Sequence, residues 1–148
     1  MDQELRRKIA DLLDRHRLMS IATNRPDGWP QATTVGYAND GLTLYFLCGR
    51  QSQKARNIAR DSRVSLTIDH DVPEPIAITG LSMAATAEPV RDPAEIAKAT
   101  ELLLRRYPEY AAYPPPDQSE ILIIKVAPKV VSILDYSKGF GHTDLVTI

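Results

Sequence analysis

Hydrophobic and polar residues alternate in several short runs along the chain, and elsewhere apolar residues recur at the spacing of a helix. Strand-like runs, rich in β-branched and aromatic residues, cover residues 18–23, 31–38, 42–47, 64–68, 76–88, 120–126 and 130–134. Apolar periodicity and helix-start residues predict helices over residues 3–16, 53–60 and 93–106. Six or seven strands with only three helices favour a closed or partly closed antiparallel barrel over a parallel α/β sheet.

Turn and cap residues divide these segments. The turn signals Pro26-Asp27-Gly28 and Asn39-Asp40-Gly41 predict that the first three strands form an antiparallel meander. Each predicted helix follows a residue suited to be its N-cap, and these are Asp2, Ser52 and Asp92. Gly80 interrupts the long strand and predicts a bend or bulge at that position.

The last third of the chain is less regular. Prolines at 108 and 114–116 predict an irregular surface loop over residues 108–118. The two β-branched runs that follow are separated by Ala127-Pro128-Lys129 and predict a final hairpin or two bent strands. Residues 135–148 show no clear period. Because no segment reads as a linker between domains, residues 1–148 are expected to form a single domain.

Composition and charge narrow the function classes. The 148 residues carry a formal net charge of -1, so nothing marks the whole surface as a binder of nucleic acid or of an acidic membrane. The sequence has no signal-peptide pattern and no apolar run near the roughly 20 residues of a membrane span, which predicts a cytoplasmic protein. Cys48 stands alone, and His16, His70 and His142 are scattered without helical pairing, so neither a disulfide nor a metal site is expected.

Residues 44–54 combine the end of a strand, a glycine turn and the start of a helix with basic and hydroxyl side chains. The unpaired N–H groups and the dipole of a helix N-terminus favour an anion. Arg50 and Lys54 would add positive charge and Ser52 a hydrogen-bond donor, which predicts a phosphate site here. The alternative is that Ser52 only caps the helix and that the basic side chains are solvated.

Four segments also resemble a known family. They are residues 24–31 (NRPDGWPQ), 44–46 (LYF), 52–58 (SQKARNI) and 62–66 (SRVSL). In order and spacing they are similar to the pyridoxamine 5'-phosphate oxidase-like, FMN-binding split-barrel family, and the likeness continues through Gly80 and residues 134–141. The resemblance implies a mainly β fold, a six-stranded antiparallel Greek-key split barrel with flanking helices. It also implies a homodimer with one FMN at each end of the interface, each FMN touching both chains.

The resemblance implies a set of cofactor-binding residues. The second strand runs beside the flavin ring in the family, and that strand maps to Thr33, Thr34, Val35, Gly36 and Tyr37. The end of the third strand maps to Leu47 and Cys48, and the phosphate ligands map to Gln53 and Lys54, with Ser52 and Arg50 nearby. The family's phosphate site therefore coincides with the anion site argued above from the residues alone.

The chain departs from the family's oxidases at three cationic positions. It has Ala32, Tyr37 and Gln53 where those oxidases carry arginine, lysine and arginine. The family's C-terminal substrate signature is not reproduced by residues 135–142 (DYSKGFGH) either. Oxidation of vitamin B6 is therefore not expected, and cofactor binding would depend on Lys54, on Arg50 and on backbone amides.

The C-terminal segment is a further candidate for the site. Tyr136, Lys138 and His142 lie in a glycine-punctuated, aromatic and basic stretch that would fold over a flavin edge, that of the partner chain. The alternative is that Phe140 pins the C-terminus onto the barrel and that the polar residues are solvated.

Three functions fit these observations. The leading hypothesis is a homodimeric FMN-dependent oxidoreductase acting on a small molecule, with no catalytic side chain assigned, because in flavoenzymes the cofactor carries the chemistry. The second is a reductase that uses the deazaflavin F420. The third is a non-catalytic protein that binds a flavin or haem.

Overall fold

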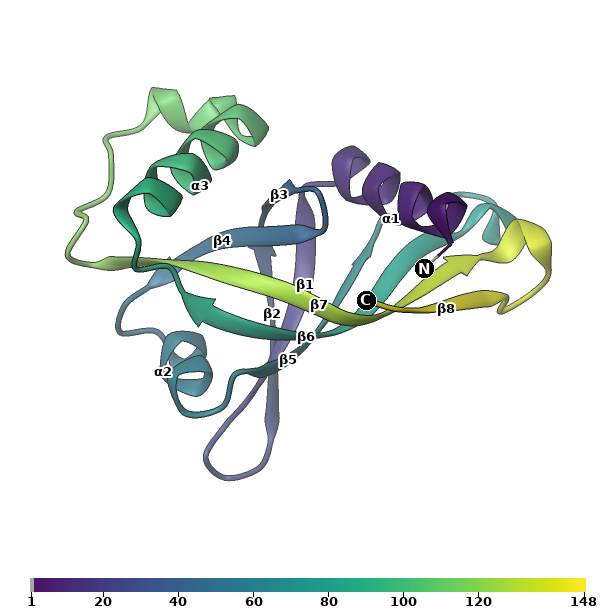
Figure 1. Cartoon of the computed structure of the whole chain (residues 1–148), viewed down its shortest axis with the longest axis horizontal. Helices are drawn as coiled ribbons and strands as arrows, with labels where there is room; N and C mark the ends of the chain where they lie inside the picture. The colour runs from purple at the N-terminus through teal and green to yellow at the C-terminus, as the bar shows by residue number, and fades with distance from the viewer. Residues whose placement is uncertain (1) are drawn as a thin grey trace.

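The computed structural model describes residues 2–148 and shows a curled antiparallel sheet with α-helices along its rim (Figure 1). The helices are α1 (Gln3–Arg15), α2 (Gln53–Arg60) and α3 (Pro93–Arg106). The strands are β1 (Leu18–Asn24), β2 (Pro30–Gly36), β3 (Ala38–Asp40), β4 (Thr43–Gly49), β5 (Arg63–Asp69), β6 (Thr79–Pro89), β7 (Ile121–Asp135) and β8 (Thr143–Thr147). Three short 3-10 helices are η1 (Pro75–Ala77), η2 (Pro108–Ala112) and η3 (Tyr136–Lys138). The predicted mainly β class and the three helices are confirmed, and the described sheet has eight strands rather than six.

The helices begin where the cap residues predict. The Asp2 carboxylate accepts from the Glu4 N–H at 2.8 Å, and the Ser52 hydroxyl accepts from the Ala55 N–H at 3.2 Å. Asp92 caps α3 in the same way, at 3.4 Å from the nitrogen of Ala94. These bonds satisfy N–H groups that have no partner inside the helix.

The predicted three-stranded meander is wrong, because after β2 the chain crosses to the opposite edge of the sheet, where β3 lies. The strands follow the order β2-β1-β5-β6-β7-β4-β3, with β8 on β7, so β2 pairs only with β1 while β4 pairs with β3 and β7. Tyr37 lies between β2 and β3, where the chain crosses. Its ring is fully buried, and its hydroxyl donates to the Leu13 carbonyl of α1 at 2.7 Å. The sheet curls until β2 lies near β4 without pairing, which leaves a split between the two edges.

The longest strand is β7, which crosses the molecule as one 15-residue segment (Figure 1). The prediction of a hairpin or two bent strands is therefore wrong, because residues 121–135 form one strand that is continuous through Pro128. The β6–β7 register shifts at this point, with Ala84 opposite Val130 and Ala85 opposite Pro128. Proline has no N–H to donate, and a bulge is where a sheet tolerates it.

The bulge was predicted at Gly80, which instead allows a close approach. A Cβ at Gly80 would lie 2.8 Å from the carbonyl oxygen of Ile68 on β5, so any side chain there would clash with backbone. The other irregular segments also differ from expectation. The predicted loop at 108–118 begins with η2, and residues 143–147 of the tail pair with β7 as β8.

The inner face of the sheet forms the core. Its largest fully buried side chains include Met19, Ile21, Leu44, Phe46, Ile68, Leu81, Ile124 and Ile133, and α1 adds Ile9 and Leu13. A smaller apolar cluster lies outside the barrel, where α3 covers β4 and β7, and it contains Tyr45, Val90, Ala99 and Ile123. This cluster fixes α3 beside the split.

The outer face of the sheet carries two rows of small, uncharged residues. One row of cross-strand neighbours is Thr34, Ser20, Thr67, Ser82, Ser132 and Leu145. The next row is Ala32, Ala22, Ser65, Ala84, Val130 and Thr147. Every member is exposed or half-buried. We refer to these twelve residues as the outer rows.

Candidate functional site

A groove of about 250 Å³ lies in the split between β2 and β4. Its lining residues are Thr34, Val35 and Gly36 of β2, Leu47 of β4, Lys54 of α2, Leu103 of α3, and Tyr107 and Tyr110. Because β2 pairs only with β1, the backbone groups on its other edge have no strand partner. The groove thus combines an open strand edge, a mostly polar lining with Leu47 and Leu103 as apolar members, and one helix start.

The start of α2 supplies the charge of the groove. The backbone N–H groups of Gln53 and Lys54 have no acceptor among the described residues, since an intrahelical bond is not available in the first turn. Lys54 forms no ion pair within residues 2–148. Two free donors, a cation and the positive end of the helix dipole make this the position where the groove best accommodates an anion.

The side chain of Ser52 serves the helix. Its hydroxyl donates to the Gly49 carbonyl at 2.7 Å and accepts from the Ala55 N–H. The hydroxyl hydrogen is thus already used, which matches the alternative in which Ser52 only caps the helix.

Arg50 points toward another segment. Its guanidinium donates to the carbonyl oxygens of Ser119 and Ile121 at 3.0 and 3.1 Å. These bonds hold the segment before β7 against the end of β4. Arg50 is not part of the groove lining, and Lys54 is the cation that the groove contains.

A buried polar network positions α2. The Asn57 side chain, 1% exposed, donates to the Thr23 hydroxyl of β1 at 3.0 Å and accepts from the Gln53 amide at 2.8 Å. Arg56 donates to the other end of the Gln53 side chain at 2.9 Å. The Gln53 side chain is therefore held along the helix, and its backbone N–H is the group left for a ligand.

Tyr107 and Tyr110 also line the groove, and neither is predicted from the sequence. A Cβ at Gly36 would lie 2.6 Å from the Tyr107 hydroxyl oxygen, so glycine is the residue that admits this ring. The Tyr107 hydroxyl donates to the Arg17 carbonyl, and the Arg17 guanidinium covers the ring at 4.5 Å. Burial raises the pKa of Tyr107, which keeps this donor protonated. No local motif indicates a contact between Gly36 and Tyr107, which are 71 positions apart in the sequence.

Two further residues of the second strand, Gln31 and Thr33, are half-buried. The Thr33 hydroxyl oxygen and the Gln31 side-chain oxygen are buried and have no hydrogen-bond partner within the described chain. Such atoms are rare in native proteins and are expected where a ligand or another chain completes the bonding. Tyr37 belongs to the core, so its side chain is not available to the groove.

Cys48 is also a core residue. Its side chain is 8% exposed among the apolar residues inside the sheet, and burial raises the pKa of its thiol. A thiol that stays protonated is a weak nucleophile. Cys48 therefore acts as a packing residue at the end of β4.

The segment with Tyr136, Lys138 and His142 lies at the far end of β7. The groove lies near the Ile121 end of that strand, opposite Gly49, while η3 follows its Asp135 end. Lys138 and His142 contact Asp144 at 3.5 and 3.3 Å. The alternative that Phe140 pins the C-terminus to the barrel is wrong, because its side chain is 96% exposed.

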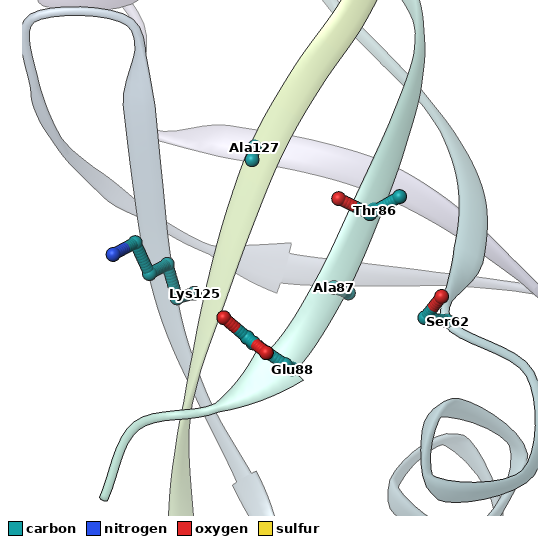
Figure 2. A pocket seen from close by; sticks show the side chains of 6 residues that line it. All are labelled: Ser62, Thr86, Ala87, Glu88, Lys125 and Ala127. Carbon is teal, nitrogen blue, oxygen red and sulfur yellow. The ribbon is translucent and has the colours of Figure 1, made fainter.

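A second hollow of about 250 Å³ borders the outer rows on β6 and β7. Figure 2 shows its lining residues: Ser62, Thr86, Ala87, Glu88, Lys125 and Ala127. The Lys125 ammonium points away from Thr86 and Ser62, and it contacts the Glu95 carboxylate at 2.9 Å (Figure 2). Small side chains thus leave this part of the sheet surface hollow.

The histidines are closer together than the sequence predicts. The Nε2 atom of His16 lies 2.7 Å from the Nδ1 atom of His70, while His142 lies on the segment before β8. Within residues 2–148 no group of three or more His, Cys, Asp or Glu side chains could hold a metal ion. Of the helices described, none has both the length and the apolar character to cross a membrane.

A curled antiparallel sheet with a split between β2 and β4 and a helix start beside it defines a split barrel. The pyridoxamine 5'-phosphate oxidase family model matches residues 5–135, and the chain belongs to this family. The resemblance stated from the sequence is confirmed.

Among curated proteins, general stress protein 26 of Bacillus subtilis is 30% identical to this chain over 69 residues. The match covers 47% of this chain and 49% of that protein, so the chain spans about half the length of this curated relative. Two solved structures show the shared fold. The match to a haem-binding protein from Mycobacterium smegmatis has a TM-score of 0.82 at 22% identity, and it covers 99% of this chain and 59% of the haem-binding protein. An F420 reductase has a TM-score of 0.66 at 34% identity, covering 82% of this chain and 94% of its own.

Proposed function

We propose that the chain is an FMN-dependent oxidoreductase that acts on a small molecule and holds its cofactor in the groove between β2 and β4. The observation that carries this proposal is the start of α2. There Lys54 and the free N–H groups of Gln53 and Lys54 meet one end of a groove with an open strand edge. The phosphate would bind at that end, and the flat ring would lie along β2.

The residues present fit such a group. Lys54 binds the phosphate by charge, and the two backbone N–H groups orient it. The open edge of Thr34–Gly36 offers backbone donors and acceptors to the polar rim of the ring, and Leu47 and Leu103 offer it apolar contacts. When bound, the flavin supplies hydride or single-electron transfer, and the protein positions and shields it.

The proposal is tested by titrating the purified full chain with FMN and following absorbance and fluorescence. Lys54→Ala should weaken FMN binding by roughly 10- to 150-fold, because a hydrogen bond to a charged group contributes about 1.5–3 kcal/mol. Arg7→Ala, which removes an exposed cation of α1, is the control and should bind FMN as the wild type does. Unchanged affinity in Lys54→Ala would remove this residue from the site, and no FMN uptake by the wild type would overturn the cofactor assignment.

The second candidate cofactor is the deazaflavin F420. It is favoured by the 34% identity with an F420 reductase over 94% of that chain. A parallel titration with F420 separates the two, since tighter binding of F420 than of FMN would select the reductase. A haem-type absorbance band in the purified protein would instead select the haem-binding alternative.

We also propose that the protein acts as a homodimer with the outer rows at the interface. Solvated sheet faces usually carry long polar or charged side chains, whereas these rows carry Ser, Thr, Ala, Val and Leu. Short side chains allow a second sheet to approach closely. A partner would also bring its residues 136–142 within reach of a groove from which those of the same chain are remote.

A further inference from the structure

Two histidine rings meet where the end of α1 approaches the end of β5. His16 follows α1 as its C-cap, and His70 follows Asp69, the last residue of β5. The Nε2 atom of His16 and the Nδ1 atom of His70 are 2.7 Å apart, and the ring centroids are 4.9 Å apart. This corner lies outside the groove, whose lining contains neither residue.

The remaining nitrogen of His16 fixes which atom faces His70. Nδ1 of His16 lies 2.7 Å from the carbonyl oxygen of Leu12. A carbonyl oxygen only accepts, so Nδ1 carries the hydrogen and donates it. In the neutral ring Nε2 then presents its lone pair toward His70, whose Nδ1–H donates to it in the metal-free pair. Binding of an ion by both nitrogens moves this hydrogen to Nε2 of His70, the other neutral tautomer of that ring. A histidine whose second nitrogen donates to a backbone carbonyl has the arrangement typical of metal ligands.

We propose that His16 and His70 form a two-nitrogen site for a divalent ion late in the first transition series, Cu²⁺ in particular. Imidazole nitrogen suits these ions, and Cu²⁺ binds most tightly among them. With metal–nitrogen bonds of about 2.0–2.1 Å, as for zinc, the two nitrogens need to separate by only a few tenths of an ångström. His70 is exposed and His16 half-buried, so small ring rotations achieve this.

The surroundings carry charges of both signs, because Arg15 and Arg17 flank His16 and Arg106 contacts its carbonyl oxygen, and they leave coordination positions open. Asp69 and Asp71 flank His70 in the sequence, and both are exposed. No third protein donor completes the set within residues 2–148, so water or a small anionic ligand would fill the other positions. An exchangeable surface site follows, rather than a closed structural one.

The site also lies next to the hydrogen bonds that hold Arg106 and Tyr107 at the end of α3. The His16 carbonyl accepts from the Arg106 guanidinium at 2.6 Å, and the next carbonyl, of Arg17, accepts from Tyr107. An ion held by His16 would therefore lie next in the sequence to Arg17, whose carbonyl oxygen holds Tyr107 at the end of α3.

The test is calorimetric titration of the full chain, without a histidine tag, with Cu²⁺, together with electron paramagnetic resonance of the complex. One ion per chain and a hyperfine pattern from two nitrogens are expected. His16→Asn and His70→Asn should each weaken binding by at least the roughly 10- to 100-fold that loss of an outer-shell partner costs. His142→Asn is the matched control and should bind as the wild type does.

Two outcomes would overturn the site. The double variant His16→Asn/His70→Asn measures the binding of Cu²⁺ by the amino terminus and other groups. One outcome against the site is a wild type that binds Cu²⁺ no more tightly than this double variant. The other is an equal loss in His142→Asn. Circular dichroism of each variant establishes that it is folded, so that lost binding is read as a lost ligand.

Discussion

Gly36 and Tyr107 set the shape of the groove at the scale of single residues. The Tyr107 ring is 9% exposed and occupies the space that a side chain at position 36 would need. Its hydroxyl and the covering Arg17 hold the ring in place. The ring cannot turn aside without losing both contacts, so the smallest added side chain at position 36 has a measurable effect.

Gly36→Ala should lower the free energy of unfolding by about 1–3 kcal/mol, the usual cost of overpacking. Denaturant unfolding followed by circular dichroism measures it. Gly49→Ala is the matched control, since its Cβ would meet no atom nearer than 3.9 Å. In a Tyr107→Leu background the effect of Gly36→Ala should shrink, because the two residues are in direct contact. Equal costs in both backgrounds would mean that Tyr107 does not set the limit.

The residues of the site were partly readable from the sequence. Lys54 and the start of α2 follow from cap chemistry, which is local, and five of the predicted residues and neighbours line the groove: Thr34, Val35, Gly36, Leu47 and Lys54. Tyr107 and Tyr110 were not foreseen, because their place depends on how α3 folds back over β2. The contact of His16 with His70 was missed for the same reason.

Asp61 connects three elements and illustrates how α2 is joined to the sheet. It ends α2 as the C-cap, and its carboxylate accepts from the Arg63 guanidinium at 2.9 and 3.0 Å and from the Asn24 amide of β1 at 3.1 Å. Hydrogen bonds from Arg63, followed by those from its backbone and from Asn24, hold the pKa of Asp61 well below its usual range. The charged carboxylate thus favours the folded state.

The sign of the pH dependence follows from this lowered pKa. The folded state holds the carboxylate charged at pH values where the unfolded chain, with a pKa of about 3.8, is already protonated. The stabilisation is therefore complete well above pH 4 and is lost as the pH falls below it. Asp61→Asn should be less stable than the wild type at pH 7, and the difference should narrow below about pH 4. A difference that stays constant down to pH 2 would contradict this role.

Elements were predicted best where their signals are local. All three helices begin at the caps read from the sequence, and α3 ends at Arg106 as expected. The meander prediction is wrong because the pairing of these strands depends on the burial of Tyr37 against α1. The turn residues on which the prediction rested carry no information about that contact. The hairpin at Pro128 failed because the proline meets a register shift that only the paired strand reveals.

The outer rows form the surface through which we expect whole molecules to meet. They run across six strands and contain no charge, which leaves the middle of the outer face without long charged side chains. Ala84 occupies the middle of one row, between Ser65 and Val130, and its side chain points out of the core. A long charged side chain at this position would hold a second sheet away.

The wild type should sediment at twice the 16.5 kDa mass of the chain in analytical ultracentrifugation. Ala84→Arg should sediment as a monomer and unfold thermally near the wild-type temperature, because no core residue changes. Ala97→Arg, on the exposed face of α3, is the matched control and should remain dimeric. A wild type that sediments as a monomer would disprove the homodimer, and a dimeric Ala84→Arg would move the interface elsewhere.

The long strand β7 has different neighbours along one of its sides. Its first half pairs with β4 and its second half with β8, while β6 runs along the other side. Without β8, residues 130–134 (VVSIL) would present unpaired backbone in a β-branched, uncharged segment of the kind that templates aggregation. The last strand thus covers this edge: by occupying the hydrogen bonds of residues 130–134 within its own chain, it leaves at the rim the short strand Thr143–Thr147, which carries the charge of Asp144, in place of a β-branched, uncharged run.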